Sequence, residues 1–67
     1  MTQCEKIRRH LEQFHSITPH EALREYGCMR LAARIADLKK AGMPIESRVI
    51  HDVNRFGERV HYSEYYV

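Results

Sequence analysis

Two arginines with a helical spacing offer the clearest chemistry in this chain. Arg30 and Arg34 stand four residues apart, so in a helix their side chains lie one turn apart on the same side. A guanidinium group presents a planar fork of N–H donors that fits phosphate oxygens and the edge of a guanine base. Eight of the eleven basic residues are arginines. The alternative is that Arg30 and Arg34 form an ordinary solvated helix face.

The histidines and cysteines do not form a pattern typical of a metal site or a catalytic centre. His10, His15 and His20 recur every five residues, which spreads them around a helix instead of gathering them on one face. Zinc-type spacing is also missing among the other candidates, Cys4, Cys28, His51 and His61. Nothing in the sequence orients a cysteine nucleophile, and the three glycines are too isolated to form a phosphate-binding loop. We therefore expect no metal, no cofactor and no enzymatic activity.

Length and composition are those of one small globular domain. A chain of 67 residues buries only about 60% of its unfolded surface and has room for one modest core. The formal net charge of +2 is too mild for a polybasic tail. No run approaches the ~20 apolar residues of a membrane span, and the first residues are polar rather than signal-like. We expect a single domain over residues 1–67, cytoplasmic, without a membrane partner and with reduced cysteines.

Two helices are predicted from their apolar stripes. In residues 3–14, apolar side chains recur at spacings of three and four, which places on one side Cys4, Ile7, Leu11 and Phe14. In residues 29–41, the buried stripe is expected to be Leu31, Ile35 and Leu38, with Ala32 beside it. The opposite side of helix 29–41 carries Met29, Arg30, Ala33, Asp37 and Lys40, with Arg34 at its edge.

A shorter helix, residues 19–26, is predicted from its start and stop signals. Thr18 can cap it, Pro19 suits its first position, and Glu21 completes a capping box. Gly27 fits the left-handed residue beyond its end. Its inner face is expected to consist of Ala22, Leu23 and Tyr26.

The last third of the chain changes to a strand pattern. Pro44 prevents the preceding helix from continuing, and the residues after it are rich in β-branched side chains. Residues 54–57 have the composition of a turn, and a strand rich in Val and Tyr follows. We therefore predict a β-hairpin over residues 45–66. Packing within the strands, rather than stacking on bases, is the favoured role of its tyrosines, Tyr62, Tyr65 and Tyr66.

The order helix, helix, turn, helix, hairpin indicates an α+β fold with three helices and a C-terminal two-stranded hairpin. The run ITPHEALREYGCMRLAARIADLKKAG, followed by this hairpin, resembles a family of short winged helix-turn-helix DNA-binding domains frequent in phages, prophages and bacteria. The resemblance covers residues 17–66, and the hairpin is the wing. One feature departs from repressor-type motifs: alanines stand six and nine positions after Gly27, and the large apolar residues are Ile35 and Leu38. This departure predicts a longer turn between the second and third helices.

The resemblance implies how the chain would bind double-stranded DNA. Helix 29–41 would enter the major groove with Arg30 and Arg34 at the base edges, while Ala33 permits close approach. Asp37 would accept a hydrogen bond from cytosine or pair with a neighbouring cation of the helix. The start of helix 19–26 and the hairpin tip would contact phosphates. The expected DNA-binding residues are therefore Thr18, Met29, Arg30, Ala33, Arg34, Asp37, Lys40, Arg55 and Arg59.

Three functions remain open at this point. The first is a phage or bacterial transcriptional regulator that binds its site as a homodimer or with a partner protein. The second is a protein-interaction module on the same scaffold, which the mild charge favours and in which Met29 and Phe56 would matter more than arginines. The third is architectural DNA binding without base preference. Arg55 and Arg59 also have an alternative role, since charges at hairpin tips prevent edge pairing.

Overall fold

The computed structural model describes residues 1–67 and contains three helices and a three-stranded antiparallel sheet. The helices are α1 (Gln3–Phe14), α2 (Pro19–Tyr26) and α3 (Leu31–Lys40). The strands are β1 (Ser16–Ile17), β2 (Glu46–Val53) and β3 (Arg59–Tyr66). The predicted α+β fold with three helices and a C-terminal hairpin is confirmed. None of the helices is long and apolar enough to cross a membrane.

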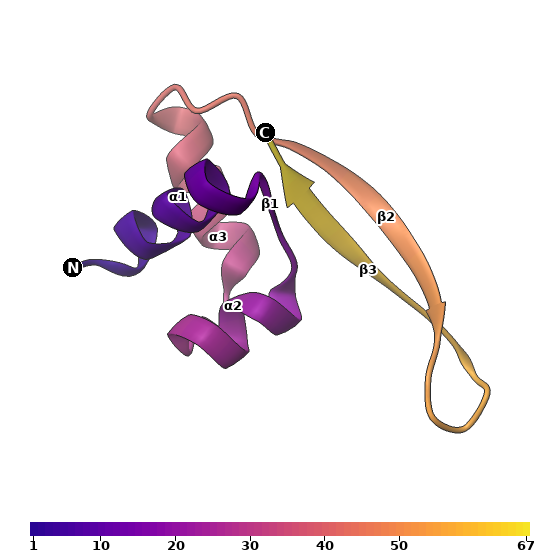
Figure 1. Cartoon of the computed structure of the whole chain (residues 1–67). Helices are drawn as coiled ribbons and strands as arrows, with labels where there is room; N and C mark the ends of the chain where they lie inside the picture. The colour runs from indigo at the N-terminus through magenta and orange to yellow at the C-terminus, as the bar shows by residue number, and fades with distance from the viewer.

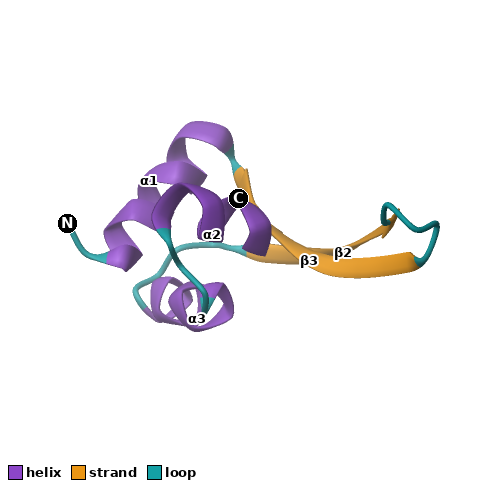
Figure 2. Ribbon diagram, turned by 90° about the horizontal axis from the view of Figure 1, so that it is seen from below, coloured by secondary structure: helices purple, strands orange, loops and turns teal.

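The hairpin β2–β3 extends away from the helices, which are gathered in a compact body (Figure 1). Its two strands are paired in register along their length, from Glu46 opposite Tyr66 to Val53 opposite Arg59. At the base of the hairpin, Tyr65 packs against the core. Pro19 and His20 of α2 line one pocket with Tyr62 of β3, and toward its tip the hairpin forms a protruding arm, which the view from below also shows (Figure 2). The molecule is therefore elongated, with extents of 39 × 22 × 20 Å.

The strand β1 was not predicted from the sequence. Its two residues pair with the end of β3, Ser16 with Tyr66 and Ile17 with Tyr65, so that the sheet order is β1-β3-β2. His15 precedes it in a left-handed conformation, with φ at 68°, and ends α1. A strand of two residues is too short for a periodic signal.

The core consists of nine buried residues drawn from all three helices and the segments between them: Ile7, Leu11, Ile17, Ala22, Cys28, Leu31, Ile35, Leu38 and Ile45. Five predicted core-side residues lie outside it: Cys4 and Tyr26 are partly buried and pack against it, and three others are exposed. Phe14 is 58% exposed and Leu23 49% exposed, because each lies at the margin of its helix face. Ala32 is exposed as well, since α3 turns its neighbour Leu31 inward instead. The core thus contains fewer residues of the helix faces than the apolar pattern predicted.

The turn between α2 and α3 has the predicted longer form and consists of Gly27–Arg30. Gly27 adopts a φ of 64° and closes α2 by donating its N–H to Leu23. Cys28 is buried at 1% exposure and fixes the middle of the turn to the core. As a result α3 begins at Leu31, and the predicted start at residue 29 was wrong, as was the predicted end at residue 41. Met29 and Arg30 belong to the turn, not to the helix.

Candidate nucleic-acid interface

The outer face of α3 presents short side chains with basic residues at its C-terminal end. The helix buries Leu31, Ile35 and Leu38. Its exposed residues are Ala32, Ala36, Asp37, Lys39 and Lys40. Alanines add little width to the helix, so a surface placed against this face could approach the helix backbone closely. Lys39 and Ala36 were not among the residues predicted for this face.

Arg34 is half-buried and lies on the flank of α3, not on its outermost face. Its Nη2 is 3.2 Å from Asp37 Oδ2, and its side chain is 34% exposed. The same Asp37 oxygen accepts a hydrogen bond from the Cys4 thiol of α1 at 3.7 Å. Arg34 Nε is buried and has no hydrogen-bond partner. The predicted pairing of Asp37 with a neighbouring cation of the helix is confirmed for Arg34.

The first turn of α3 is the only helix start without an acidic residue or a side-chain cap. Thr2 caps α1 with Glu5 in its first turn, and Thr18 caps α2 with Glu21. At α3, the N-cap position is the exposed Arg30, which makes no capping hydrogen bond. The partial positive charge of the helix end is therefore reinforced by a cation instead of being neutralised. This end of α3 is electrostatically suited to an anion.

Thr18 is less available than expected. Its hydroxyl accepts from the Glu21 N–H at 3.2 Å and donates to Glu21 Oε1 at 3.1 Å. The same carboxylate accepts from the Thr18 N–H at 3.0 Å, which completes the predicted capping box. A phosphate at this helix start would have to lie beside the Glu21 charge. Thr18 is thus primarily a structural cap.

The other predicted residues divide between two separate surfaces. Most of them are exposed: Met29, Arg30, Asp37, Lys40, Arg55 and Arg59. Ala33, like Thr18 and Arg34, is half-buried. The residues of α3 and its preceding turn lie together on the helical body. Arg55 lies in the loop between β2 and β3, and Arg59 begins β3; this end of the hairpin points away from the helices in both views (Figures 1 and 2).

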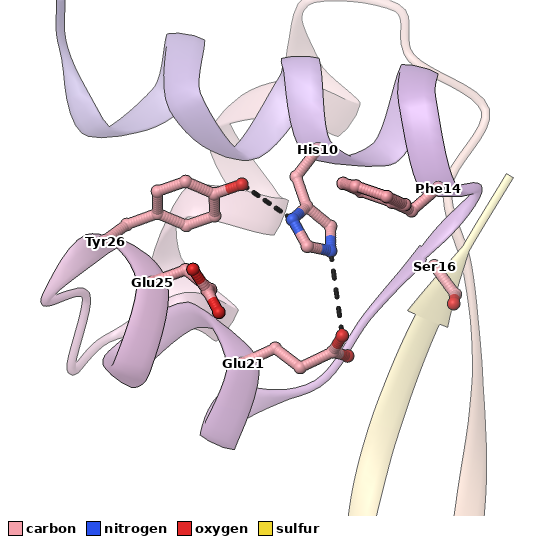
Figure 3. A pocket seen from close by; sticks show the side chains of 6 residues that line it. All are labelled: His10, Phe14, Ser16, Glu21, Glu25 and Tyr26. Carbon is pink, nitrogen blue, oxygen red and sulfur yellow. Dashed lines mark hydrogen bonds and ion pairs between the residues drawn. The ribbon is translucent and has the colours of Figure 1, made fainter.

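A buried polar cluster that the sequence did not predict joins α1 to α2 (Figure 3). His10 is only 6% exposed, and its Nδ1 lies 2.7 Å from the Tyr26 hydroxyl. His10 Nε2 faces Glu21 Oε2 at 3.8 Å, and the Phe14 ring lies 4.8 Å from the imidazole. These side chains line a cavity of about 280 Å³. The available signal was the position of His10 next to Leu11 and three residues after Ile7, within the apolar stripe of α1.

Tyr26 remains a hydrogen-bond donor in this cluster. Burial raises its pKa above the ordinary value of 10.0, and the charges of Glu25 and Glu21 raise it further. A protonated phenol can donate to His10 Nδ1, which places the imidazole proton on Nε2, toward Glu21. The cluster therefore links the capping box of α2 to α1 through one chain of polar contacts. We assign it a structural role in orienting the two helices.

Residues 2–67 match the family model of a winged helix-turn-helix domain. Searches of curated proteins and of solved structures found no significant match. The family match covers the helices and the hairpin alike and supports a general role in DNA binding.

Proposed function

Because the chain belongs to the family of winged helix-turn-helix domains, we propose that it is a transcriptional regulator of phage, prophage or bacterial type. In this proposal α3 enters the major groove of double-stranded DNA and the hairpin contacts the flanking backbone. The main supporting observation is the exposed, alanine-rich face of α3, which begins at an uncapped helix end carrying Arg30. The resemblance of the chain to short phage-type domains favours the regulatory role.

The fit to the groove follows from the small side chains of α3. A major groove about 12 Å wide admits one helix, and close approach requires a face without bulky residues. Ala32, Ala33 and Ala36 provide such a face. Arg30 stands at the N-terminal end of α3, the end that helix-turn-helix proteins commonly present to base edges. A bidentate contact from Arg30 to guanine would contribute about 1–3 kcal/mol of discrimination.

Arg34 has a secondary role in this proposal. Its guanidinium is already paired with Asp37, so it is oriented and partly neutralised before DNA arrives. It would extend from the flank of α3 to a phosphate or base edge beside the groove. Asp37 itself would be an orienting residue rather than the acceptor for a cytosine.

Phosphate contacts would come from exposed cations on both surfaces. Lys39 and Lys40 lie in the last turn of α3, and Arg55 and Arg59 lie at the hairpin end. Met29 is 84% exposed beside Arg30 and would contact the sugar edge or a thymine methyl group. Such phosphate contacts supply affinity without sequence information and weaken as salt rises. Thr18 would contribute less, because its hydroxyl is already used by Glu21.

A single domain of this size offers one recognition helix and on the order of 600–1,000 Å² of contact with DNA. A homodimer on a two-fold site, or a second protein, would therefore provide the rest of the specificity. Phe14 and Cys4 of α1 are candidate residues for such an interface. Each protomer would select one half-site, so the number of half-sites in the selected DNA gives the oligomeric state of the bound protein.

A protein-interaction module is the second candidate function. Two large apolar side chains support it, since Met29 and Phe56 are 84% and 82% exposed. In that case truncation of either apolar residue would abolish partner binding, and Arg30 and Arg34 would be dispensable. An architectural DNA-binding protein would instead bind duplexes of every sequence with similar affinity.

Selection of binding sites from a random duplex library distinguishes these functions. A regulator enriches one motif, and Arg30→Ala relaxes the preference at one guanine position. Arg8→Ala is the matched control, because the same charge is lost from an exposed arginine of α1 that pairs with Glu12 and lies outside the proposed interface. Binding without enrichment would indicate an architectural role. The absence of binding to any duplex would contradict the proposal and favour the interaction module.

A further inference from the structure

Phe56 occupies an unusual place for a large aromatic residue. It lies in the loop at the far end of the hairpin and is 82% exposed, whereas the core is formed entirely by residues of the helical body and its connections. Both views place this loop at the extremity of the molecule (Figures 1 and 2). Packing within the chain therefore gives no reason for an aromatic side chain at this position.

The loop that carries Phe56 is held in one conformation by Asn54. The Asn54 side-chain oxygen accepts from the Phe56 N–H at 2.9 Å and from the Glu58 N–H at 3.0 Å. Gly57 donates to the Asn54 carbonyl at 3.0 Å and adopts a φ of 77°, which favours glycine. The Asn54 N–H donates to the Glu58 carbonyl and closes the loop. The backbone of the loop that carries Phe56 is therefore preorganised by these hydrogen bonds.

The surroundings of Phe56 are basic and apolar. Arg55 precedes it, and Arg59 begins the returning strand opposite Val53. Val53 and Val60 are 59% and 37% exposed, and they lie on opposite faces of the hairpin because Val53 is paired with Arg59, the neighbour of Val60. The single acidic side chain of the loop, Glu58, accepts a hydrogen bond from the Asn54 amide at 3.2 Å. Two exposed arginines near an exposed aromatic ring suit a nucleic acid, which has phosphates outside and base stacks within.

We propose that Phe56 is a wedge that enters the minor groove beside the major-groove site and inserts between two base pairs. This inference rests on the proposed function, since it requires that the domain bind DNA. Proteins that bend DNA from the minor groove commonly insert an apolar side chain at a base step, which unstacks the step and kinks the duplex. Arg55 and Arg59 would bind the phosphates on either side of the kink. The protein would then bend its site as well as read it.

The test compares wild type with Phe56→Ala and Phe56→Leu on the selected duplex. Bending is measured by energy transfer between dyes at the two duplex ends. Unstacking is measured by the fluorescence of 2-aminopurine placed at successive steps beside the site. Val49→Ala is the matched control, because Val49 is 56% exposed on β2 but lies away from the tip. Anisotropy on the same duplex measures affinity, and circular dichroism confirms that each variant is folded.

We expect wild type to bend the duplex and to raise 2-aminopurine fluorescence at one step. Phe56→Ala should lose at least half of both signals and weaken binding about three- to tenfold, while Phe56→Leu retains most of both because leucine also serves as a wedge. Equal bending and fluorescence for wild type and Phe56→Ala, with binding intact, would overturn the wedge but leave the proposed function standing. Failure of wild type to bind any duplex would overturn both.

Discussion

Asp37 Oδ2 lies 3.2 Å from Arg34 Nη2 and also accepts the Cys4 thiol hydrogen bond at 3.7 Å. This carboxylate thus connects the proposed recognition helix to α1 and restrains Arg34. It also places a negative charge on a helix whose proposed ligand is a polyanion. Asp37 therefore has two opposing effects on DNA binding: it orients Arg34, which favours binding, and it repels phosphates, which weakens binding.

Asp37→Asn should strengthen binding to random duplex DNA about two- to fivefold at low salt, because one repulsive charge is lost and Arg34 is released toward phosphate. The measurement is fluorescence anisotropy. Glu12→Gln on α1 is the matched control, since it also removes one carboxylate that pairs with an arginine. If Asp37→Asn weakens binding while Glu12→Gln leaves it unchanged, orientation of Arg34 is worth more than the relief of repulsion.

Thr18→Ala should lower the free energy of unfolding by about 1 kcal/mol, because α2 is a short helix that loses its N-cap and the hydrogen bonds to Glu21. Urea denaturation measures the change. Thr18→Ser is the matched control, since serine keeps the capping hydroxyl. DNA affinity should change little in either variant once the folded fraction is taken into account. A tenfold loss of affinity in a fully folded Thr18→Ala protein would assign Thr18 a direct phosphate contact.

Tyr26 should make the domain sensitive to alkaline pH. Burial, with Glu25 and Glu21 beside it, raises the pKa of the phenol, so the folded chain holds this proton more tightly than the unfolded chain. The corresponding stability is present below pH 10.0, the ordinary pKa, and is lost as pH rises through the folded-state pKa.

Tyr26→Phe should therefore flatten the decline in stability above about pH 10, while costing about 1 kcal/mol near neutrality through the lost hydrogen bond to His10. Urea denaturation at about pH 8 and about pH 11 measures both effects. Tyr62→Phe is the control, because Tyr62 lies on the hairpin and outside this cluster. An equally steep alkaline decline in Tyr26→Phe would show that the phenol does not account for it.

The sequence identified the elements that carry strong local signals. The capping box at Thr18 and Glu21 formed as predicted, and so did the end of α2 at Gly27, because both depend on residues close in sequence. The alanines six and nine positions after Gly27 correctly indicated a longer turn. In each case the chemistry of a few neighbouring residues determines the local backbone.

Contacts between distant segments were harder to predict. The pairing of Ser16 and Ile17 with the end of β3 joins residues from opposite ends of the chain, and no local pattern marks it. The burial of His10 depends on Tyr26, which lies on another helix. The exposure of Ala32 depends on which way α3 is turned against the core. The roles of the DNA-binding residues remain predictions, because a free domain shows which side chains are available and not what they bind.

The most direct test of DNA binding is the salt dependence of anisotropy with random-sequence duplex DNA. Wild type should lose at least tenfold in affinity between about 50 and 200 mM salt, because several phosphates are neutralised. A variant that combines Arg30→Ala, Lys40→Ala and Arg55→Ala should bind more weakly at low salt and show a shallower slope, by about one unit per lost phosphate contact. No binding at 50 mM salt, or a slope unchanged in this variant, would contradict the proposed DNA interface.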